Sequence, residues 1–395
     1  MKNRIEYLDS LRGIVAFSVV IFHCMISFNI FHSANYKADY RNGFIKFITE
    51  SPLKVLWSGQ EAVLLFFVLS GFVLSISFLK GKNNNYNIFL ARRFARIYIP
   101  YIIVMLVSVV LASIFMNFKD IDGLSSTFDN RWDHAVTWKS ILAYIFMINY
   151  DTANVNGVVW TLYHEMRISV MFPILMMIVI KWKALKSLLV SCILLSASWL
   201  TLMLISKYST GTISFIASDF SNTVFYTAFF VFGAILSKYR TEVSNYISRL
   251  NPLIKLFMFV ISMILMSARW VGVVSPILPG YIQDLTAGAG IVILFCVALS
   301  SSFAQSVLMS KPLLWLGKIS FSLYLIHILV LLLLVNLFGS YIGVGVIWLT
   351  PIASLPVAAL VYKFVEEPAI KIGRNWTSVL KNRDSKIKNA KTRAV

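Results

Sequence analysis

Apolar runs of about 20 residues recur along this chain, and they constrain its fold more than any other feature. A helix of that length rises about 30 Å, which is the thickness of the hydrocarbon core of a bilayer. The runs extend from position 11 to position 364 without a long polar stretch between them. Only 13% of the residues are charged, whereas soluble domains have about 25%. The sequence therefore predicts an all-α fold, a polytopic integral membrane bundle.

Ten of these runs predict transmembrane helices. The first follows Lys2 and Arg4 and has no small-residue cleavage site after it, so we interpret it as an uncleaved span rather than a signal peptide. Another run, 138–149, would rise only about 18 Å and predicts a short re-entrant or interfacial segment. We expect one transmembrane domain, 1–370, and a basic tail, 371–395. The predicted spans are 11–31, 60–79, 97–117, 158–180, 185–205, 219–237, 253–268, 285–303, 312–337 and 343–364.

The net charge of +19 is explained by membrane topology without a nucleic-acid partner. With ten spans and both termini in the cytoplasm, most of the Lys and Arg residues fall in cytoplasmic segments, as the positive-inside rule requires. The basic tail has no apolar face, so it either rests near anionic membrane lipid or is disordered; the simplest reading is a topology signal.

Arg12 and His23 are the first candidate functional residues, because ionisable groups within a span usually face a cavity or the bundle interior. Eleven helical steps of about 100° bring both side chains to one face, about 16 Å apart along the axis. Arginine binds phosphate well and histidine is the usual general base near neutral pH, which suits a charged donor that enters from the cytoplasm. The alternative is that Arg12 anchors the helix and His23 is a buried polar residue with no chemical role.

Glu165 and His327 are predicted to lie at a similar depth to His23, about 10 to 15 Å below the outer edge of the membrane. A carboxylate beside an imidazole would orient the ring, so these residues are candidate catalytic partners. Glu165 could instead form an ion pair with Arg167 for helix packing, although residues two apart do not share a helix face. His164 lacks the second histidine of a zinc-binding helix motif, and we predict no metal site.

A cluster formed by Arg92, Arg93 and Arg96 precedes the third span, where it either grips the phosphates of a nucleotide-containing donor or anchors the helix. Ser70 and Gly71 interrupt the second span near its middle. Small residues favour close helix packing, and the gap they leave could also line a channel.

Six segments, in the right order along nearly the whole chain, resemble motifs of the acyltransferase-3 family of membrane acyltransferases. They are Leu8-Asp9-Ser10-Leu11-Arg12-Gly13 with His23, Gly59 to Phe72, Arg93 with Arg96, Trp160-Thr161-Leu162 with Glu165, Leu316 to His327 (which includes Tyr324), and Glu367-Pro368.

This resemblance implies ten core helices, a cytoplasmic acyl-CoA donor that is usually acetyl-CoA, and a hydroxyl acceptor on a lipid-linked or exported glycan. Arg12, Arg93 and Arg96 would bind the donor, and His23 would act as base or transient acyl carrier. Glu165 and His327 would support His23. The resemblance places the protein in the inner (cytoplasmic) membrane of a bacterium.

The sequence departs from the family at Leu64, where many members have Asp or Pro, and at Gln60, where a subgroup has His. Some members carry an additional hydrolase-like domain after the membrane core. Here a short basic tail follows instead, so we expect direct transfer or a separate extracytoplasmic partner that receives the acyl group.

We therefore predict an acyl-CoA-dependent O-acetyltransferase of a surface polysaccharide or lipid-linked glycan, without a resident cofactor. The main alternative is a polytopic transporter or exporter of a glycan or small molecule, because polar residues within a bundle also suit a substrate path. A structural or sensory membrane protein is the third interpretation. An exporter does not require arginines that bind CoA phosphates, and the arginine cluster therefore distinguishes the acyltransferase interpretation from the exporter interpretation.

Overall fold

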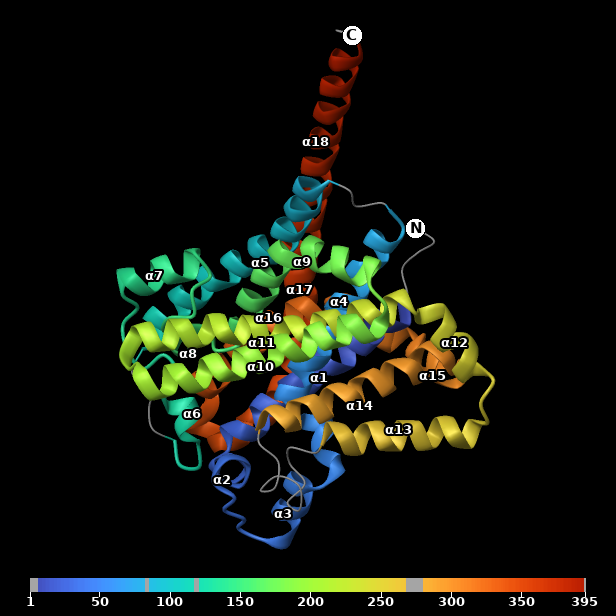
Figure 1. The fold of residues 1–395 in the computed structure, drawn as a ribbon. Helices are drawn as coiled ribbons and strands as arrows, with labels where there is room; N and C mark the ends of the chain where they lie inside the picture. The colour runs from blue at the N-terminus through green and yellow to red at the C-terminus, as the bar shows by residue number, and fades with distance from the viewer. Residues whose placement is uncertain (1–5, 82–84, 117–120, 268–279, 394–395) are drawn as a thin grey trace.

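The computed structural model describes residues 6–81, 85–116, 121–267 and 280–393, and within these ranges all regular structure is helical (Figure 1). The exception is a single antiparallel bridge between Phe28 and Leu124. The predicted all-α class is therefore confirmed. The longer helices are α1 (Glu6–Ser27), α4 (Gln60–Leu79), α5 (Tyr86–Ile114), α9 (Trp160–Lys181), α10 (Ala184–Tyr208), α11 (Gly211–Lys238), α13 (Pro252–Met266), α14 (Gly280–Ser300), α16 (Lys311–Ile342), α17 (Thr350–Val361) and α18 (Glu367–Arg393).

Eight helical segments of the described chain are long and apolar enough to cross a membrane, which makes this a multi-pass membrane protein. The last of these segments, Lys311–Leu380, includes the two predicted spans 312–337 and 343–364. The predicted span 253–268 corresponds to α13, an apolar helix of 15 residues. The described residues of all ten predicted spans thus lie mainly on helices, while residues 117 and 268, which end the predicted spans 97–117 and 253–268, lie outside the described ranges. The short run at 138–149 forms α7 (Trp138–Ile145), which rises only about 12 Å.

The centre of the bundle is built on close approaches between helix backbones. Gly13 of α1 lies against α16, where an added Cβ would come within 2.5 Å of the amide nitrogen of Gly317. Gly71 of α4 lies against Phe230 of α11, and an added Cβ there would also overlap backbone atoms. Small residues permit such approaches in membranes, where dispersion contacts replace the hydrophobic effect as the source of helix association. The close packing predicted for the small residues of the second span is confirmed at Gly71.

Short helices connect the long ones at two ends of the bundle, and Figure 1 shows these ends at opposite sides. The first group, here called the α12–α15 end, lies near the N-terminus (right in Figure 1). The second, the α6–α8 end, includes the loop that meets the end of α1 through hydrogen bonds from Asn29 to Gly123 and from Ser125 to Ser27. The connecting elements are α2 (Asn29–Lys37), α3 (Gly43–Glu50), η1 (Pro52–Trp57), α6 (Ser126–Asp129), α7, α8 (Thr152–Asn156), α12 (Arg240–Ser248), α15 (Ser302–Leu308), η2 (Gly343–Leu349) and the π-helical turn Tyr362–Glu366.

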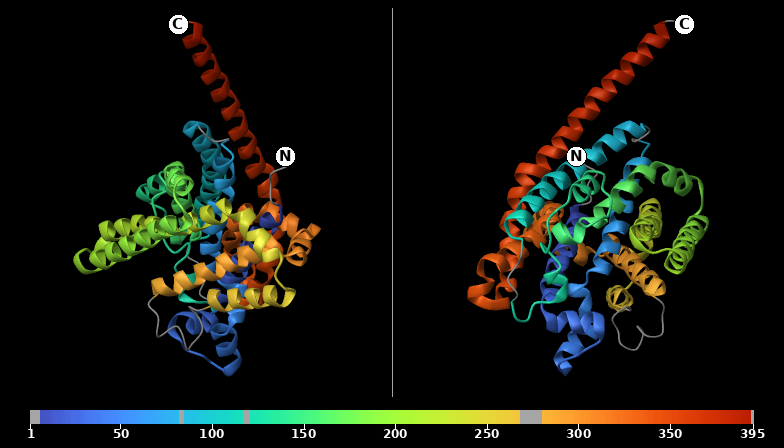
Figure 2. Two further views of the ribbon diagram at one scale, coloured as in Figure 1. Left: turned by 45° about the vertical axis from the view of Figure 1, so that its right-hand side comes forward. Right: turned by 90° about the vertical axis from the view of Figure 1, so that its left-hand side faces the viewer.

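Helices α10 and α11 project from one side of the bundle as an adjacent pair (Figure 2). Only 17% of the apolar window of α10 is buried within the protein, so most of its surface suits lipid contact. Helix α18 extends well beyond the bundle (Figures 1 and 2). The basic tail is part of this helix as far as Arg393. Its first turns pack on α5, where Arg92 Nε donates a hydrogen bond to Thr377 Oγ1 at 3.2 Å.

Candidate active site

His23 and His327 face each other from α1 and α16, with His23 Nδ1 at 3.1 Å from His327 Nε2. The Nδ1 atom of His327 lies 3.1 Å from the carbonyl oxygen of Leu323, and that of His23 lies 3.0 Å from the carbonyl oxygen of Val19. A carbonyl oxygen only accepts hydrogen bonds, so both Nδ1 atoms carry the proton. The one Nδ1–H of His23 is then shared between the Val19 carbonyl oxygen and His327 Nε2, and in this tautomer His23 Nε2 carries the lone pair.

The two histidines differ in access. His23 lines a cavity of about 990 Å³ at the α6–α8 end, here called the outer cavity, whereas His327 is fully buried and does not line this cavity. His23 is therefore accessible from the outer cavity, and His327 lies behind it. The outer cavity also contacts α2, α3 and the loop around Arg131, and its other lining residues include Tyr36, Tyr40, Glu50, Gln60, Thr127 and Trp160.

At the rim of the outer cavity, Tyr40 donates a hydrogen bond to the carboxylate of Glu50, with Oη and Oε1 2.5 Å apart. Burial and this carboxylate raise the pKa of Tyr40 to about 12, so the phenol stays protonated at physiological pH. This hydrogen bond ties the segment between α2 and α3 to the end of α3, and it holds the wall of the outer cavity on that side.

The arginines line a second, smaller cavity of about 70 Å³, here called the inner cavity. Arg93 is buried and its Nη2 lies 2.6 Å from Oε1 of Glu165, while its Nε donates to Ser169 Oγ at 3.1 Å. Ser70 Oγ donates to the same carboxylate oxygen at 3.3 Å. Arg12 and Arg96 complete the charged wall, and Arg12 lies 3.8 Å from Asp9. Three guanidinium groups thus share one cavity with a half-buried carboxylate.

Tyr324 and Val63 line both cavities, so they mark the boundary between the two. The Tyr324 hydroxyl lies 2.8 Å from that of Thr161 and donates to the carbonyl oxygen of Val158 at 3.1 Å. Phe66 packs edge-on against the Tyr324 ring, with centroids 5.7 Å apart. Because α16 carries both Tyr324 and His327, this boundary and the histidine pair are held by one helix.

The structure separates the predicted site residues into two groups. His23 and His327 form one group, and Glu165 belongs to the other, with the arginines rather than beside an imidazole. Ser70 and Tyr324 line the inner cavity as well. Arg92 lines neither cavity and contacts α18 instead.

Two buried polar clusters were missed by the sequence interpretation. Arg167, considered above as a partner of Glu165, pairs with Asp219 of α11 at 2.6 Å. Glu366 of the π-helical turn accepts a hydrogen bond from Ser322 of α16 at 2.7 Å. An intramembrane acid is the signal that could have indicated both, but a single sequence does not reveal the partner on a distant helix.

No group of three or more His, Cys, Asp or Glu side chains that could hold a metal ion occurs within the ranges that the structure describes. The three cysteines are unpaired, and Cys24 is buried.

The fold and the site define a class of protein. It is a multi-pass membrane protein in which a cavity lined by histidine adjoins a cavity lined by arginine. The chain belongs to the acyltransferase domain family, which it matches over residues 5–363, and the resemblance to acyltransferase-3 proteins is confirmed. It is similar to the peptidoglycan O-acetyltransferase OatA of Listeria monocytogenes serovar 1/2a (strain ATCC BAA-679 / EGD-e), with 23% identity over 391 residues. That match covers 94% of this chain and 57% of the relative. No solved structure matches.

Proposed function

We propose that this protein transfers an acyl group, in the simplest case acetyl, from cytoplasmic acyl-CoA to a hydroxyl of a cell-surface glycan. One observation carries the proposal: His23 lines a large cavity that meets an arginine-lined cavity at Tyr324. The relative's printed activity, peptidoglycan O-acetylation, supports a surface glycan as acceptor.

The α12–α15 end is assigned to the cytoplasm of a bacterium, with both termini on that side. Its connecting segments carry Arg240, Arg249, Lys255 and Lys311, which agrees with the positive-inside rule. The arginine-lined cavity then serves a donor from the cytoplasm, and the outer cavity serves an acceptor from the other side.

Arg12, Arg93 and Arg96 would hold the phosphates of the donor, because a guanidinium group presents paired N–H donors to phosphate oxygens. The inner cavity of about 70 Å³ is too small for the donor's thioester arm as it stands. We therefore expect donor binding to move Tyr324 and Phe66, which connects the two cavities.

His23 supplies the chemistry in either of two balanced sequences. As general base, its Nε2 takes the acceptor hydroxyl proton while the oxygen attacks the thioester carbonyl; the C–S bond breaks, and CoA leaves as thiolate and receives a proton. As acyl carrier, Nε2 attacks the thioester carbonyl first, the C–S bond breaks and CoA leaves as thiolate. The acceptor hydroxyl then attacks the acyl-imidazolium, the C–N bond breaks to return the imidazole, and the hydroxyl proton balances the one that the thiolate takes up. A separate extracytoplasmic partner that receives the acyl group is a second acceptor that we propose for the same chemistry.

The first test separates this enzyme from an exporter. Acetyl-CoA should raise the melting temperature of the purified protein. At a concentration of 100 times its Kd, the ligand should add about 2.7 kcal/mol to the free energy of unfolding. Expression in a strain that lacks the gene should restore O-acetyl groups to the surface glycan. An exporter would show neither effect, and the absence of both would overturn the proposal.

His327 has a distinct expected role, because its Nε2 orients the His23 ring without reaching the cavity. His327→Leu should lower kcat about tenfold, which corresponds to about 1.4 kcal/mol, since His23 Nδ1–H loses an acceptor. His327→Gln offers an amide oxygen at that place and should recover most of the rate. Single-turnover acetyl transfer measures both; equal losses in the two variants would show that His327 only fills space.

A further inference from the structure

Arg131 lies in the loop between α6 and α7, and its side chain lines the outer cavity together with His23. Its Nε donates to the carbonyl oxygen of Thr127 at 3.3 Å. Gly157 makes room for the guanidinium group, because an added Cβ there would lie only 3.0 Å from Nη1. The chain thus holds this cation at a fixed place in the cavity wall.

The guanidinium group lacks the partners that a buried charge normally has. Its Nη1 is buried and makes no hydrogen bond with the described part of the protein. No ion pair joins it to a carboxylate among the side chains that the structure describes; Glu50, on the same cavity, accepts from Tyr40 instead. Burial lowers the pKa of Arg131 to about 10, so the group remains cationic at neutral pH.

A buried N–H group of a cation is destabilising unless it is paired, so a bound anion that accepts from Nη1 would remove this cost. The surroundings suit a polar ring compound: Trp160 and Tyr36 present aromatic surfaces, and Thr127 presents a hydroxyl to the same cavity. An anionic group bound at Arg131 would lie in the outer cavity, which His23 also lines.

We propose that Arg131 is an anion subsite for the acceptor, which binds a carboxylate or phosphate of the glycan and so directs one of its hydroxyls to His23. The proposal rests on the proposed function for the role of the bound molecule, although the binding itself can be tested without catalysis. Carboxylate and phosphate share the recognition chemistry, since the planar guanidinium fork pairs with the oxygens of either.

The test compares three oligosaccharides of similar length on the full-length protein: neutral chitotetraose, chitotetraose 1-phosphate, and a tetrasaccharide of alternating N-acetylglucosamine and N-acetylmuramic acid, which carries carboxylates. Affinity is measured by the shift in melting temperature over a ligand titration. We expect at least one anionic probe to bind the wild type 10- to 100-fold more tightly than the neutral probe, as about one charge-assisted pair requires. Which anionic probe binds identifies the source of the charge.

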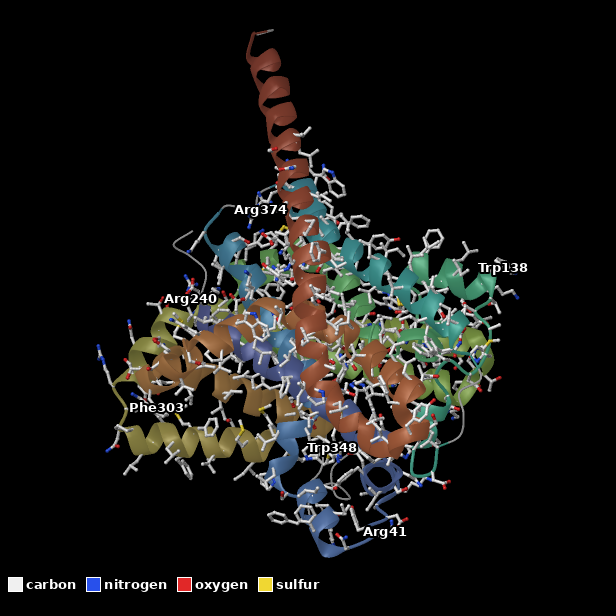
Figure 3. The ribbon with its side chains drawn as sticks, turned by 180° about the vertical axis from the view of Figure 1, so that it is seen from behind. Arg41, Trp138, Arg240, Phe303, Trp348 and Arg374 are labelled. Atoms are coloured by element: carbon white, nitrogen blue, oxygen red, sulfur yellow. The ribbon has the colours of Figure 1, made fainter. Side chains whose placement is uncertain are left out.

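Arg131→Gln should remove this preference and leave the weak binding of chitotetraose unchanged, and Arg131→Lys should keep part of it. The matched control is Arg41→Gln, which removes an exposed cation at the far tip of the α2–α3 segment (Figure 3). Arg41→Gln should keep the full preference. The proposal is overturned if no anionic probe binds the wild type better than chitotetraose, or if Arg131→Gln and Arg41→Gln behave alike.

Acetyl-CoA binding by the same proteins keeps this proposal distinct from the proposed function. Arg131→Gln should bind acetyl-CoA as the wild type does, because Arg131 lines the outer cavity only. If the wild type does not bind acetyl-CoA, the enzyme assignment fails, while the oligosaccharide comparison still decides whether Arg131 is an anion subsite.

Discussion

His23→Ala is expected to lower acetyl transfer by about 10²- to 10⁴-fold, the range that general acid–base groups contribute. The reason is geometric: His23 is the residue of the histidine pair that reaches the outer cavity, and its Nε2 is the unprotonated nitrogen. Transfer is measured as O-acetyl content of the surface glycan in a deletion strain that carries each variant. Purified protein and radiolabelled acetyl-CoA give the corresponding rate.

The control for His23→Ala is donor binding. Because the arginines and Glu165 line a separate cavity, the variant should bind acetyl-CoA with wild-type affinity. A variant that restores acetylation to the wild-type level would show that His23 has no chemical role, and catalysis would then have to be sought elsewhere. Acid quenching after one turnover distinguishes the two mechanisms, since label covalently bound to wild-type protein, but not to His23→Ala, indicates an acyl carrier.

Hydropathy and charge predicted most of the fold, because the bilayer requires long apolar helices that satisfy their own backbone groups. That Arg12 and His23 share one face of α1 stays a prediction, because the two residues line different cavities. Helix ends were less well predicted: α5 begins at Tyr86, before the apolar run at 97–117, because its first turns are polar and pack on α18.

The lateral arrangement could not be read from one sequence. His327 lies 304 residues from His23, and only the packing of α16 on α1 brings them together. Equal depth in the membrane suggested that Glu165 would join them, but depth does not specify direction around a helix axis, and Glu165 points to Arg93. Arg131 gave no signal at all, because a single arginine in a polar loop is unremarkable until its burial is known.

Arg93→Met should have a second large effect, on stability and donor binding together. Arg93 and Glu165 form a buried ion pair of 2.6 Å within the membrane-spanning bundle, and removal of one partner from such a pair costs about 3 to 5 kcal/mol. The loss of a guanidinium group that would contact CoA phosphates should also weaken acetyl-CoA binding 10- to 100-fold. Thermal unfolding in detergent measures the first effect, and acetyl-CoA titration measures the second.

A double variant separates the two effects. Arg93→Met with Glu165→Gln removes the uncompensated carboxylate, so most of the stability should return, whereas acetyl-CoA binding should remain weak because the cation is still missing. The matched control is Arg92→Met, one position earlier on α5, whose guanidinium contacts Thr377 and lines neither cavity. It should leave donor affinity within about twofold of the wild type, or 0.4 kcal/mol.

If Arg92→Met weakens donor binding as much as Arg93→Met does, the arginines act through their summed charge at the membrane surface. If the double variant recovers donor binding as well as stability, Arg93 serves only to neutralise Glu165, and the donor phosphates must be held by Arg12 and Arg96.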